Sequence, residues 1–391
     1  MKYKIPLSKP VITQDMIEAA INALNNEKLV MGESVYKFEE EFAKYLGVKH
    51  AVAVNSGTSA LILAYKTINL GNGSKFIAPS ATFISTISSA MLLGAKPIFT
   101  DINLDTYTID TKHLEKQLNE NNNVKAIVPV HLYGYPCRMD KIVELAEEKS
   151  IVVIEDCAQA HGARYKGRKV GTFGEVAIFS FYPIKNMTVC GDGGMLVTNN
   201  DEIAEETRKL RDCGRKGKYS HDTLGYVFRL NTVNAAIGLV QLKYLDKWNE
   251  KRRHLASIYD KHLSNIEGVT ISPKLNGSIK PVYHLYVIRL RNKRMRDALG
   301  AYLEYNGIQA LIHYPIPVHM QEAYKKYYRD NVVLKNTEIW ADTVLSIPLY
   351  PELSEDEVKY IVEKIQLFIE KRLYLDKEWV RKGVEWYRKL I

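Results

Sequence analysis

Seven short apolar runs stand out in the first half of the chain, and most are continuous rather than alternating, as expected for strands buried on both faces. They are HAVAVN (50–55), KFIAPS (75–80), PIFTDI (97–102), VKAIVPVHL (124–132), IVVIED (151–156), VAIFSF (176–181) and GGMLVTN (193–199). Helical patterns such as TSALILAYKTI lie between several of them, which predicts an α/β fold with a mostly parallel sheet. The connection before GGMLVTN is too short for a crossover helix, so we expect that strand to run antiparallel.

The pattern changes after residue 230. The segment TVNAAIGLVQLKYLDKWNEKRRHLASIYDKHL predicts one long helix, and PVYHLYVIRL is a strand candidate. Further on, Ser354 and Glu357 form a capping-box signature at the start of another helix. We therefore expect a large domain over residues 1–245, including the N-terminal segment, and a smaller α+β domain over residues 246–391.

The last residues, 372–391, form a basic tail with helical spacing of large apolar side chains. The residues that fall broadly on one side are Trp379, Val380, Val384, Trp386, Tyr387 and Ile391. A helix this aromatic is predicted to pack on the protein or on its partner. Docking on a membrane surface is the alternative.

Composition narrows the function classes. The chain has 391 residues and a net charge of +9, with 46% apolar and 25% charged residues, values ordinary for a globular protein. The charge favours anionic partners such as phosphorylated metabolites. Neither a zinc-finger spacing nor an arginine-rich block is seen, so a nucleic-acid partner is not expected. Four scattered cysteines, no signal segment and no run of transmembrane length predict a cytoplasmic protein without a membrane role.

Three motifs carry candidate chemistry, and the first is a strand-end carboxylate. The run IVVIED ends in Asp156, and ligands of α/β sheets bind beyond the carboxyl ends of the strands. An Asp after a strand is often only a cap for a turn or helix. The alternative is a carboxylate directed at a cationic group of a ligand.

The second motif is NSGTSAL, residues 55–61, where a strand runs into small polar residues and a helix is predicted to begin at about Thr58 or Ser59. The amides at a helix N-terminus bind anions, and Gly57 lets the backbone approach closely. A simple N-cap needs one hydroxyl only. Three hydroxyls around a glycine favour phosphate binding.

The third motif is FSFYPIKN, in which Lys185 follows a buried apolar run. A lysine in such a loop commonly extends its amine to solvent. Loss of hydration would instead lower its pKa and give a neutral amine that attacks carbonyls. A phosphate anchor, a strand-end carboxylate and a desolvated lysine are together three parts of a pyridoxal phosphate site.

These motifs, in this order, resemble those of the DegT/DnrJ/EryC1/StrS family of sugar aminotransferases, within the fold type I group of pyridoxal phosphate enzymes. The resemblance includes GESVYKFEEEFAKYLGVKHAVAVNSGTSAL, EDCAQAHGARYKGRKVGTFGEVAIFSFYPIKN, GDGGMLVTN and GIQALIHYPIPVHMQEAY. It extends from IPLSKP to about residue 370. It implies a large domain that binds pyridoxal 5′-phosphate and carries a seven-stranded sheet.

The resemblance also implies roles for single residues. Lys185 would bind the cofactor aldehyde as a Schiff base, and Asp156 would pair with the pyridine nitrogen. Gln159 would reach the phenolic oxygen of the cofactor. Thr58, Ser59 and Ser180 would hold the phosphate, and Phe83 would stack on the ring.

Substrate contacts are expected from two further segments. His313, Tyr314 and His319 lie in IHYPIPVH, which resembles the substrate-facing loop of the family, and Tyr182 is either a wall of the sugar pocket or a core aromatic residue. The spacing of the histidines matches no metal-ligand motif, so no metal is predicted, and His131 and His161 are expected to be structural. Cys190 is expected to be a small buried apolar residue.

One departure from the family concerns Val227, which occupies the position of an asparagine that reaches the phosphate in the neighbouring subunit. Arg229 is retained and is a candidate cofactor contact. The family also implies a homodimer with active sites at the subunit interface. Either Arg229 or Asn231 is expected to reach toward the phosphate in place of the missing amide, or ordered water is expected to fill the gap.

The function implied by the resemblance is amino transfer from glutamate to the ketone of a nucleotide-linked keto-deoxysugar. The segments AQAHGA, YHLYVIR and IHYPIPVH most resemble those of family members that act at C3 of the hexose, which favours C3 over C4. One alternative is a sugar dehydratase of the same family, although those enzymes carry a histidine at the position of Lys185. The other alternative is a regulatory protein without enzymatic activity.

Overall fold

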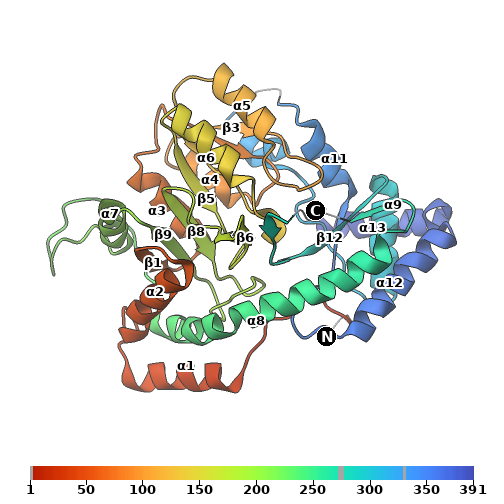
Figure 1. Cartoon of the computed structure of the whole chain (residues 1–391), viewed down its shortest axis with the longest axis horizontal. Helices are drawn as coiled ribbons and strands as arrows, with labels where there is room; N and C mark the ends of the chain where they lie inside the picture. The colour runs from red at the N-terminus through yellow and green to blue at the C-terminus, as the bar shows by residue number, and fades with distance from the viewer. Residues whose placement is uncertain (1–2, 272–276, 329–331) are drawn as a thin grey trace.

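A sheet of seven strands forms the centre of the protein (Figure 1). The structure is a computed structural model that describes residues 3–271, 277–328 and 332–391. The strand order is β1-β9-β8-β5-β4-β2-β3. The bounds are β1 His50–Val54, β2 Lys75–Pro79, β3 Lys96–Thr100, β4 Val124–Ile127, β5 Val152–Asp156, β8 Val176–Ser180 and β9 Gly194–Thr198. Six of the seven apolar runs contain a whole strand, and the run at 97–102 contains all of β3 except Lys96, so the predicted α/β fold is confirmed.

The sheet is mostly parallel. Neighbouring strands from β3 to β8 pair in parallel, whereas β9 is antiparallel to both β8 and β1. The connection from Ser180 to Gly194 contains no helix, so the chain can return only in the opposite direction. The predicted antiparallel strand is therefore confirmed.

Helices cover both faces of this sheet. They are α1 Gln14–Asn26, α2 Glu33–Leu46, α3 Gly57–Thr67, α4 Ser85–Met91, α5 Thr111–Glu120, α6 Met139–Glu148 and α7 Asp201–Arg211. Helices α3, α4 and α7 share an apolar cluster with Ile178 of β8, whereas α2 packs with the next residue, Phe179. Successive side chains of a strand point to opposite faces, which explains why the apolar runs are continuous.

The long helix α8, Thr232–Leu263, runs from the large sheet to the second half of the molecule (Figure 1). A small antiparallel sheet follows, with β12 Tyr286–Leu290 between β10 Val269–Ile271 and β13 Val344–Ile347. Its helices are α9 Lys293–Tyr305, α10 Glu322–Lys325, α11 Lys335–Thr343 and α12 Glu355–Glu370. The expected domain boundary at residue 245 falls inside α8, which continues without a break.

Short elements complete the fold. A second small sheet is formed by β6 Arg164–Tyr165, β7 Arg168–Lys169 and β11 Ile279–Lys280, and the 3-10 turns are η1 Leu132–Gly134, η2 Val318–Met320 and η3 Leu373–Leu375. The predicted capping box is present, because the Ser354 side chain and the Glu357 side chain bond to each other's backbone amides.

The strand predicted at residues 281–290 is shorter than expected, since β12 begins at Tyr286. The backbone amides of Val282 and His284 donate instead to the carbonyls of Gly134 and Tyr133. Tyr283 between them has a φ of 44°, which interrupts extended structure. These residues therefore join the small sheet to the turn after β4.

The N-terminal segment before α1, which carries Ile5 and Leu7, packs against the second half of the molecule. Ile5 bridges to Ile308, and the amide of Leu7 donates to Gln309 Oε1 at 2.9 Å. Both Ile5 and Leu7 belong to the apolar cluster formed by α9, α12 and the small sheet.

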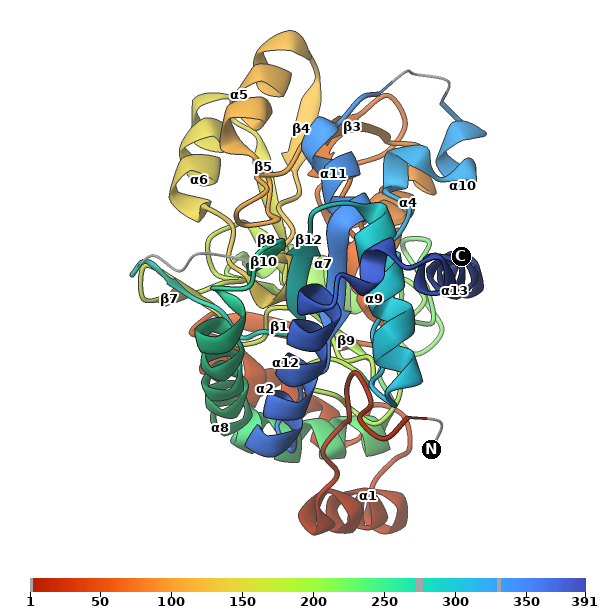
Figure 2. The ribbon, with the colours of Figure 1, turned by 90° about the vertical axis from the view of Figure 1, so that its right-hand side faces the viewer.

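The tail forms helix α13, Lys377–Leu390, which packs along α9 (Figure 2). Trp386 is 4% exposed, and its indole lies so close to Gly300 of α9 that an added Cβ there would be 2.5 Å from it. Trp379 makes an edge contact with Tyr302 at a centroid distance of 5.0 Å. The predicted packing of the tail is confirmed, although Val384 and Ile391 lie exposed.

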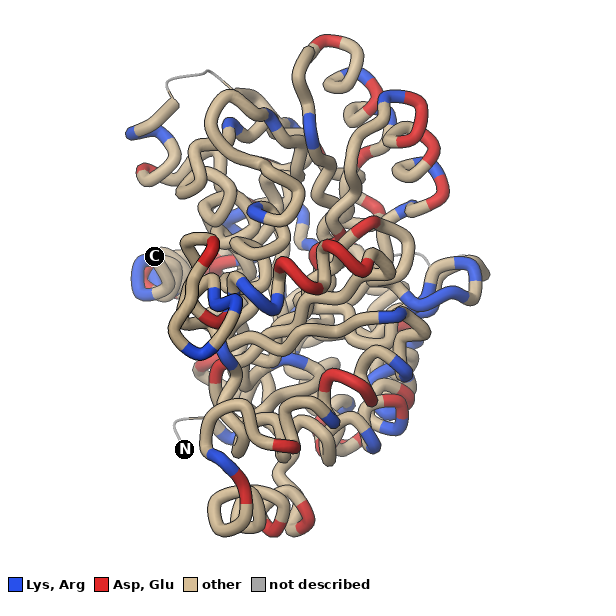
Figure 3. Tube along the Cα trace, turned by 90° about the vertical axis from the view of Figure 1, so that its left-hand side faces the viewer, with Lys and Arg blue, Asp and Glu red and all other residues tan. Residues whose placement is uncertain are grey.

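In the described parts of the chain, no helix combines the length and the apolar character that crossing a bilayer requires. Acidic and basic positions are interspersed along the trace seen in Figure 3.

Candidate active site

A cavity of about 450 Å³ opens where β5 and β8 end, at Asp156 and Ser180. Because parallel strands present their carboxyl ends at one edge of the sheet, residues distant in sequence meet there. Nine of the candidate residues line this cavity: Thr58, Phe83, Asp156, Gln159, Ser180, Tyr182, Lys185, His313 and Tyr314. Ser59, Arg229 and His319 do not.

Lys185 lies in the loop between β8 and β9 and is half-buried. Its amide donates to the Tyr182 carbonyl at 2.8 Å. The next residue, Asn186, is buried and donates to Asn249 of α8 at 2.9 Å and to the Val282 carbonyl at 2.8 Å. Burial lowers the pKa of Lys185 to about 8, against the opposing effect of Asp156. A minority of the amine is therefore neutral near physiological pH, a far larger share than at the ordinary pKa of 10.5, and this neutral form can attack a carbonyl carbon.

The Asp156 carboxylate is buried at the end of β5, with each oxygen held by one donor. Oδ2 accepts the Thr86 hydroxyl at 2.8 Å, and Oδ1 accepts the Ala158 amide at 3.1 Å. Burial raises the pKa of Asp156, whereas these hydrogen bonds and the charge of Lys185 oppose the rise. A carboxylate held at the cavity wall in this way suits a cationic ring nitrogen.

The N-terminus of α3 forms another wall. Helix α3 begins at Gly57 with Ser56 as its N-cap, slightly earlier than predicted, and Ser56 Oγ accepts the Ser59 amide at 3.0 Å. Gly57 and Thr58 line the cavity. A Cβ at Gly57 would lie 2.8 Å from the Cβ of Ser180, so glycine is what lets helix and strand end approach. The backbone amides in the first turn of α3 and the hydroxyls of Thr58 and Ser180 all lie at this part of the cavity wall, and such a set of donors suits a phosphate group.

The early start of α3 also explains the position of Ser59. Its hydroxyl donates to Asn55 Oδ1 at 2.6 Å and faces an adjoining open hollow of about 580 Å³. Each residue turns a helix by about 100°, so an N-cap at Ser56 leaves Thr58 at the cavity and rotates Ser59 away from it. Ser59 thus lines this adjoining hollow and not the cavity.

Gln159, Tyr314 and Phe83 lie together at another part of the cavity wall. Gln159 Oε1 accepts the Tyr133 amide at 2.7 Å, which orients its Nε2 toward the Tyr314 hydroxyl at 3.0 Å. The rings of Phe83 and Tyr314 have centroids 5.8 Å apart. Phe83 is 52% exposed here, so its ring is available to a flat ligand in the cavity.

Three of the expected substrate contacts lie at this cavity, and one does not. Tyr182 is 49% exposed at the rim, and His313 enters from the second half with Nδ1 at 3.0 Å from Ser346 Oγ. Burial lowers the pKa of His313 to about 4, so it is neutral at physiological pH. His319 is buried elsewhere, with Nδ1 at 2.7 Å from Ser80 Oγ, and fastens η2 to the end of β2.

The segment that departs from the family lies outside the cavity. Arg229 pairs with Asp212 at 2.5 Å, and Asn231 caps α8 by accepting the Asn234 amide at 2.9 Å. Val227 is 61% exposed. Within one chain, none of these side chains reaches the cavity, whereas Asn231 lines the adjoining hollow.

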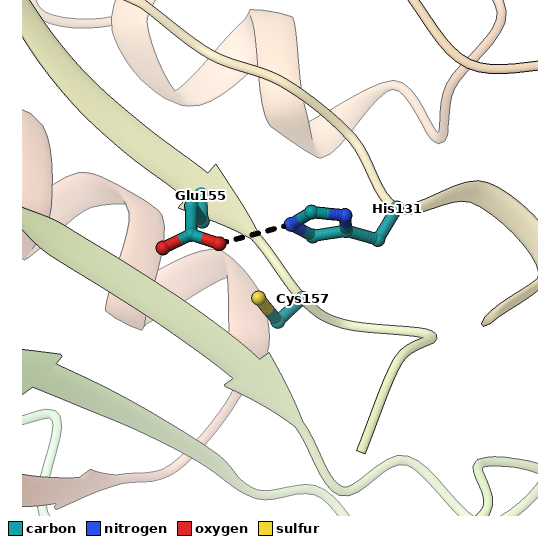
Figure 4. Close-up of side chains that lie close together, drawn as sticks. All are labelled: His131, Glu155 and Cys157. Atoms are coloured by element: carbon teal, nitrogen blue, oxygen red, sulfur yellow. Dashed lines mark hydrogen bonds and ion pairs between the residues drawn. The ribbon is translucent and has the colours of Figure 1, made fainter. Parts of the chain in front are cut away.

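A buried group of three side chains lies close together near the site: His131, Glu155 and Cys157 (Figure 4). Each offers one atom that could bind a metal ion, and these atoms lie within 4.8 Å of one another. His131 Nδ1 accepts the Cys137 amide at 2.9 Å, so Nε2 carries the proton donated to Glu155 at 3.1 Å. Glu155 also accepts the amides of Gly171, Phe173 and Gly174. Burial alone would raise the pKa of Glu155, but these donors hold it below its ordinary value. These hydrogen bonds connect β5 to the segments that carry His131 and Gly171, and His131 therefore has the structural role that was predicted.

The prediction for Cys190 is wrong. Cys190 is exposed and lines the adjoining hollow with a φ of 58°. Its position in the turn that precedes Gly191 keeps its side chain out of the core. His161, in contrast, is buried, and its ring packs against Phe179 and Phe181 as a structural histidine would.

Sequence reasoning missed several cavity residues. Thr82 and Thr86 follow β2 and line the cavity beside Asp156, and Asp192 lies between the cavity and the adjoining hollow. The position of Thr82 beyond a strand end was an available signal. Nothing in the sequence connects Thr86 to a carboxylate seventy residues further along the chain.

The cavity fits pyridoxal phosphate in its donor set: a poised amine, a held carboxylate and a helix N-terminus with hydroxyls. Together with the seven-stranded sheet, these features define a fold type I pyridoxal phosphate enzyme. The family model for the DegT/DnrJ/EryC1/StrS aminotransferase family matches residues 10–366. The chain belongs to this family of pyridoxal-phosphate-dependent aminotransferases.

Relatives and a solved structure agree with this assignment. The dTDP-3-amino-3,4,6-trideoxy-alpha-D-glucose transaminase of Streptomyces venezuelae is 39% identical over 355 residues, 90% of this chain and 92% of that protein. A Geobacillus stearothermophilus protein named pleiotropic regulatory protein is 39% identical over 346 residues, 88% and 92% of the two chains. The PLP form of Spr1654 from Streptococcus pneumoniae has a TM-score of 0.89 at 27% identity, covering 94% and 99%.

Proposed function

We propose that this enzyme transfers an amino group from L-glutamate to the ketone of a nucleotide-linked keto-deoxysugar, at C3 in preference to C4. The observation that carries the proposal is the meeting of Lys185, Asp156 and the α3 N-terminus around one cavity. The name of the Streptomyces venezuelae relative, a 3-amino sugar transaminase, supports the choice of C3.

Each residue has a role toward the cofactor in this proposal. Bound pyridoxal phosphate supplies a ring that withdraws electrons from the donor's α-carbon. Lys185 would hold the cofactor aldehyde at rest and, once displaced by the donor amine, move a proton from the donor Cα to the cofactor C4′. Asp156 would keep the ring nitrogen protonated, because a carboxylate stabilises a neighbouring cation.

Other cavity residues would bind and orient. Gly57 and Thr58 at the start of α3, with the Ser180 hydroxyl, would hold the phosphate. Phe83 would cover one face of the ring, and Gln159 would donate Nε2 to the phenolic oxygen in place of its present acceptor, Tyr314. Tyr182, His313 and Tyr314 are placed to contact the sugar from the rim and from the second half of the molecule.

We also propose a cytoplasmic homodimer in which the partner completes each site. Leu224 and Val227, in the loop between α7 and α8, are 90% and 61% exposed, and Ile21 and Leu24 of α1 are 53% and 56% exposed. We take these exposed apolar side chains of α1 and of the loop as surface that a partner subunit would cover. Arg229 or Asn231 would then approach the partner's phosphate. The four cysteines are free, which suits a reducing compartment.

Two other functions deserve a direct comparison. A sugar dehydratase of this family is disfavoured by Lys185, whose amine provides the covalent attachment that transamination uses. A regulatory role is suggested by the name of the Geobacillus relative. Because a regulator needs no turnover of glutamate, a visible absorption band that shifts on adding glutamate would favour the enzyme.

The decisive experiment is a panel of nucleotide-linked 3-keto and 4-keto sugars, incubated with the holoenzyme and glutamate and analysed by mass spectrometry. We expect the amino product from 3-keto members. An amino product from 4-keto members only would move the proposal to C4. No amino product from any member, in the presence of a glutamate-dependent spectral change, would reject this substrate class.

A further inference from the structure

Beneath Asp156 lies a chain of hydrogen bonds that the proposed reaction does not yet use. Thr86 stands in the first turn of α4 and is 1% exposed, and Thr82 precedes it in the loop after β2 and is 3% exposed. Buried hydroxyls at this depth require partners. The partners found here lead step by step to Asp156.

The direction of these hydrogen bonds follows from the chemistry of the groups. Asp156 Oδ2 lies 2.8 Å from Thr86 Oγ1. Because an ionised carboxylate can only accept hydrogen bonds, the Thr86 hydroxyl donates its single proton to Asp156. Thr82 Oγ1 lies 2.8 Å from Thr86 Oγ1 and must therefore be the donor between the two hydroxyls. The chain runs from Thr82 to Thr86 to Asp156.

The main chain that carries Thr86 is fixed as well. Tyr65 of α3 donates its phenol to the Thr86 carbonyl at 2.6 Å and is itself fully buried. The other oxygen of Asp156 is held by the Ala158 amide. Each carboxylate oxygen therefore has one donor from the protein, and the carboxylate borders the cavity with acceptor capacity left.

We propose that Thr86, itself oriented by Thr82, is a positioning residue that fixes the Asp156 carboxylate toward the ring nitrogen of pyridoxal phosphate. The inference rests on the proposed role of Asp156. Hydrogen bonds that favour a charged acceptor also favour its ionised form, so the same contact keeps the buried carboxylate charged. Without it, Asp156 would be both freer to rotate and easier to protonate.

The test uses the full-length protein stripped of cofactor and titrated with pyridoxal phosphate from pH 5 to pH 8, with the visible absorbance as readout. Thr86→Val keeps the shape but removes the hydroxyl, Thr86→Ser keeps the hydroxyl, and Thr82→Val removes only the first donor. The matched control is Thr198→Val, which removes a buried hydroxyl that donates to the Glu175 carbonyl at 2.8 Å. The ionisable groups that bear on Asp156 are common to all variants: Tyr65, His131, Cys157, Lys185 and Tyr314.

In Thr86→Val, we expect cofactor affinity to fall about tenfold. The pH below which affinity is lost should rise by about one unit, because losing a hydrogen bond to a charged group changes the free energy by about the amount that corresponds to one pH unit. Thr86→Ser should restore both values. Thr82→Val should shift both in the same direction by less, and it carries the test if Thr86→Val does not fold.

The results that overturn the proposal are distinct from those that overturn the function. If Thr86→Val and Thr82→Val match Thr198→Val in affinity and pH dependence, the threonines do not position Asp156. Asp156→Asn, which cannot ionise in this range, should lose the pH dependence that belongs to the carboxylate. If Asp156→Asn keeps the wild-type pH dependence, the role of Asp156 itself is wrong and the proposal falls with it.

Discussion

Single residues of this site acquire their chemistry from burial and from one or two neighbours. Lys185 would be an ordinary surface cation in an open loop, but the buried Asn186 beside it ties the loop to α8 and keeps the amine at the cavity. Asp156 keeps its place through donors on two different segments. The chemistry therefore depends on how firmly the surrounding segments are held.

The first prediction concerns the cost of burying the Lys185 ammonium in the cofactor-free protein. The folded pKa of about 8 lies below the ordinary 10.5, so the folded state loses its proton before the unfolded state as pH rises. The free-energy cost of burying the ammonium is therefore complete below pH 8 and decreases as the pH rises from 8 to 10.5. We expect Lys185→Met to raise the free energy of unfolding by roughly 1–2 kcal/mol at pH 7, the full shift being reduced by partial exposure, and by much less at pH 10.

Urea unfolding of the cofactor-free protein at both pH values checks this prediction. Lys247→Met is the control, because Lys247 is exposed on α8. An equal effect of Lys185→Met at pH 7 and pH 10 would show that the change comes from packing and not from charge.

Much of the site at this scale could be predicted from the sequence, because Asp156 ends a strand and both Lys185 and Thr58 follow a strand within a few residues. Ser59 could not be placed, since the direction of its hydroxyl depends on the residue at which α3 begins. His319 shares a short segment with His313, yet a turn at η2 directs it into the core. Thr86 required knowledge of which segments meet in space.

At the scale of elements, continuous apolar runs located the strands, and the helical pattern of apolar residues located the long helix. The helix predicted from residue 232 to residue 263 has those bounds in the structure, because its pattern continues without glycine or proline breaks strong enough to end it. The strand expected over residues 281–290 was half wrong. Its first residues are as apolar as its last, but they bond to a turn and not to a neighbouring strand.

Helix α13, like the short turn η3 before it, lies beyond the family match, which ends at residue 366. It covers α9, the helix that leads into the segment carrying His313 and Tyr314. Close approach at Gly300 and Gly383 lets the two helices pack tightly, since an added Cβ at Gly383 would lie 2.7 Å from the Ala298 amide nitrogen. The apolar face of α13 is used by this contact, which leaves little of it for a membrane surface.

We predict that Trp386→Ala lowers the free energy of unfolding by about 3 kcal/mol, because truncating a buried tryptophan removes its packing and leaves a cavity. Val384→Ala is the matched control on the same helix: Val384 is 45% exposed, and a change of less than about 0.5 kcal/mol is expected. Chemical denaturation measures both. A loss below about 1 kcal/mol for Trp386→Ala would mean that α13 is only loosely attached.

At the scale of the whole molecule, the proposed homodimer would cover the exposed apolar residues of α1 and of the loop after α7. We predict a particle of about twice the chain mass of 44.7 kDa by sedimentation, and a weaker dimer in Leu224→Asp, since a charge would be buried in the contact. Leu375→Asp is the control, because Leu375 is 57% exposed on η3 away from these elements. A monomer at micromolar concentration would reject the shared site.

In the proposed function, Lys185 holds pyridoxal phosphate and releases it when glutamate donates its amine. The most direct measurement is reduction of the holoenzyme with labelled borohydride, with and without prior glutamate, followed by peptide mapping. We predict label on the peptide containing Lys185 in the first sample and its loss in the second, where the cofactor has left the lysine. Label on another lysine, or label on Lys185 that glutamate does not diminish, would contradict the account.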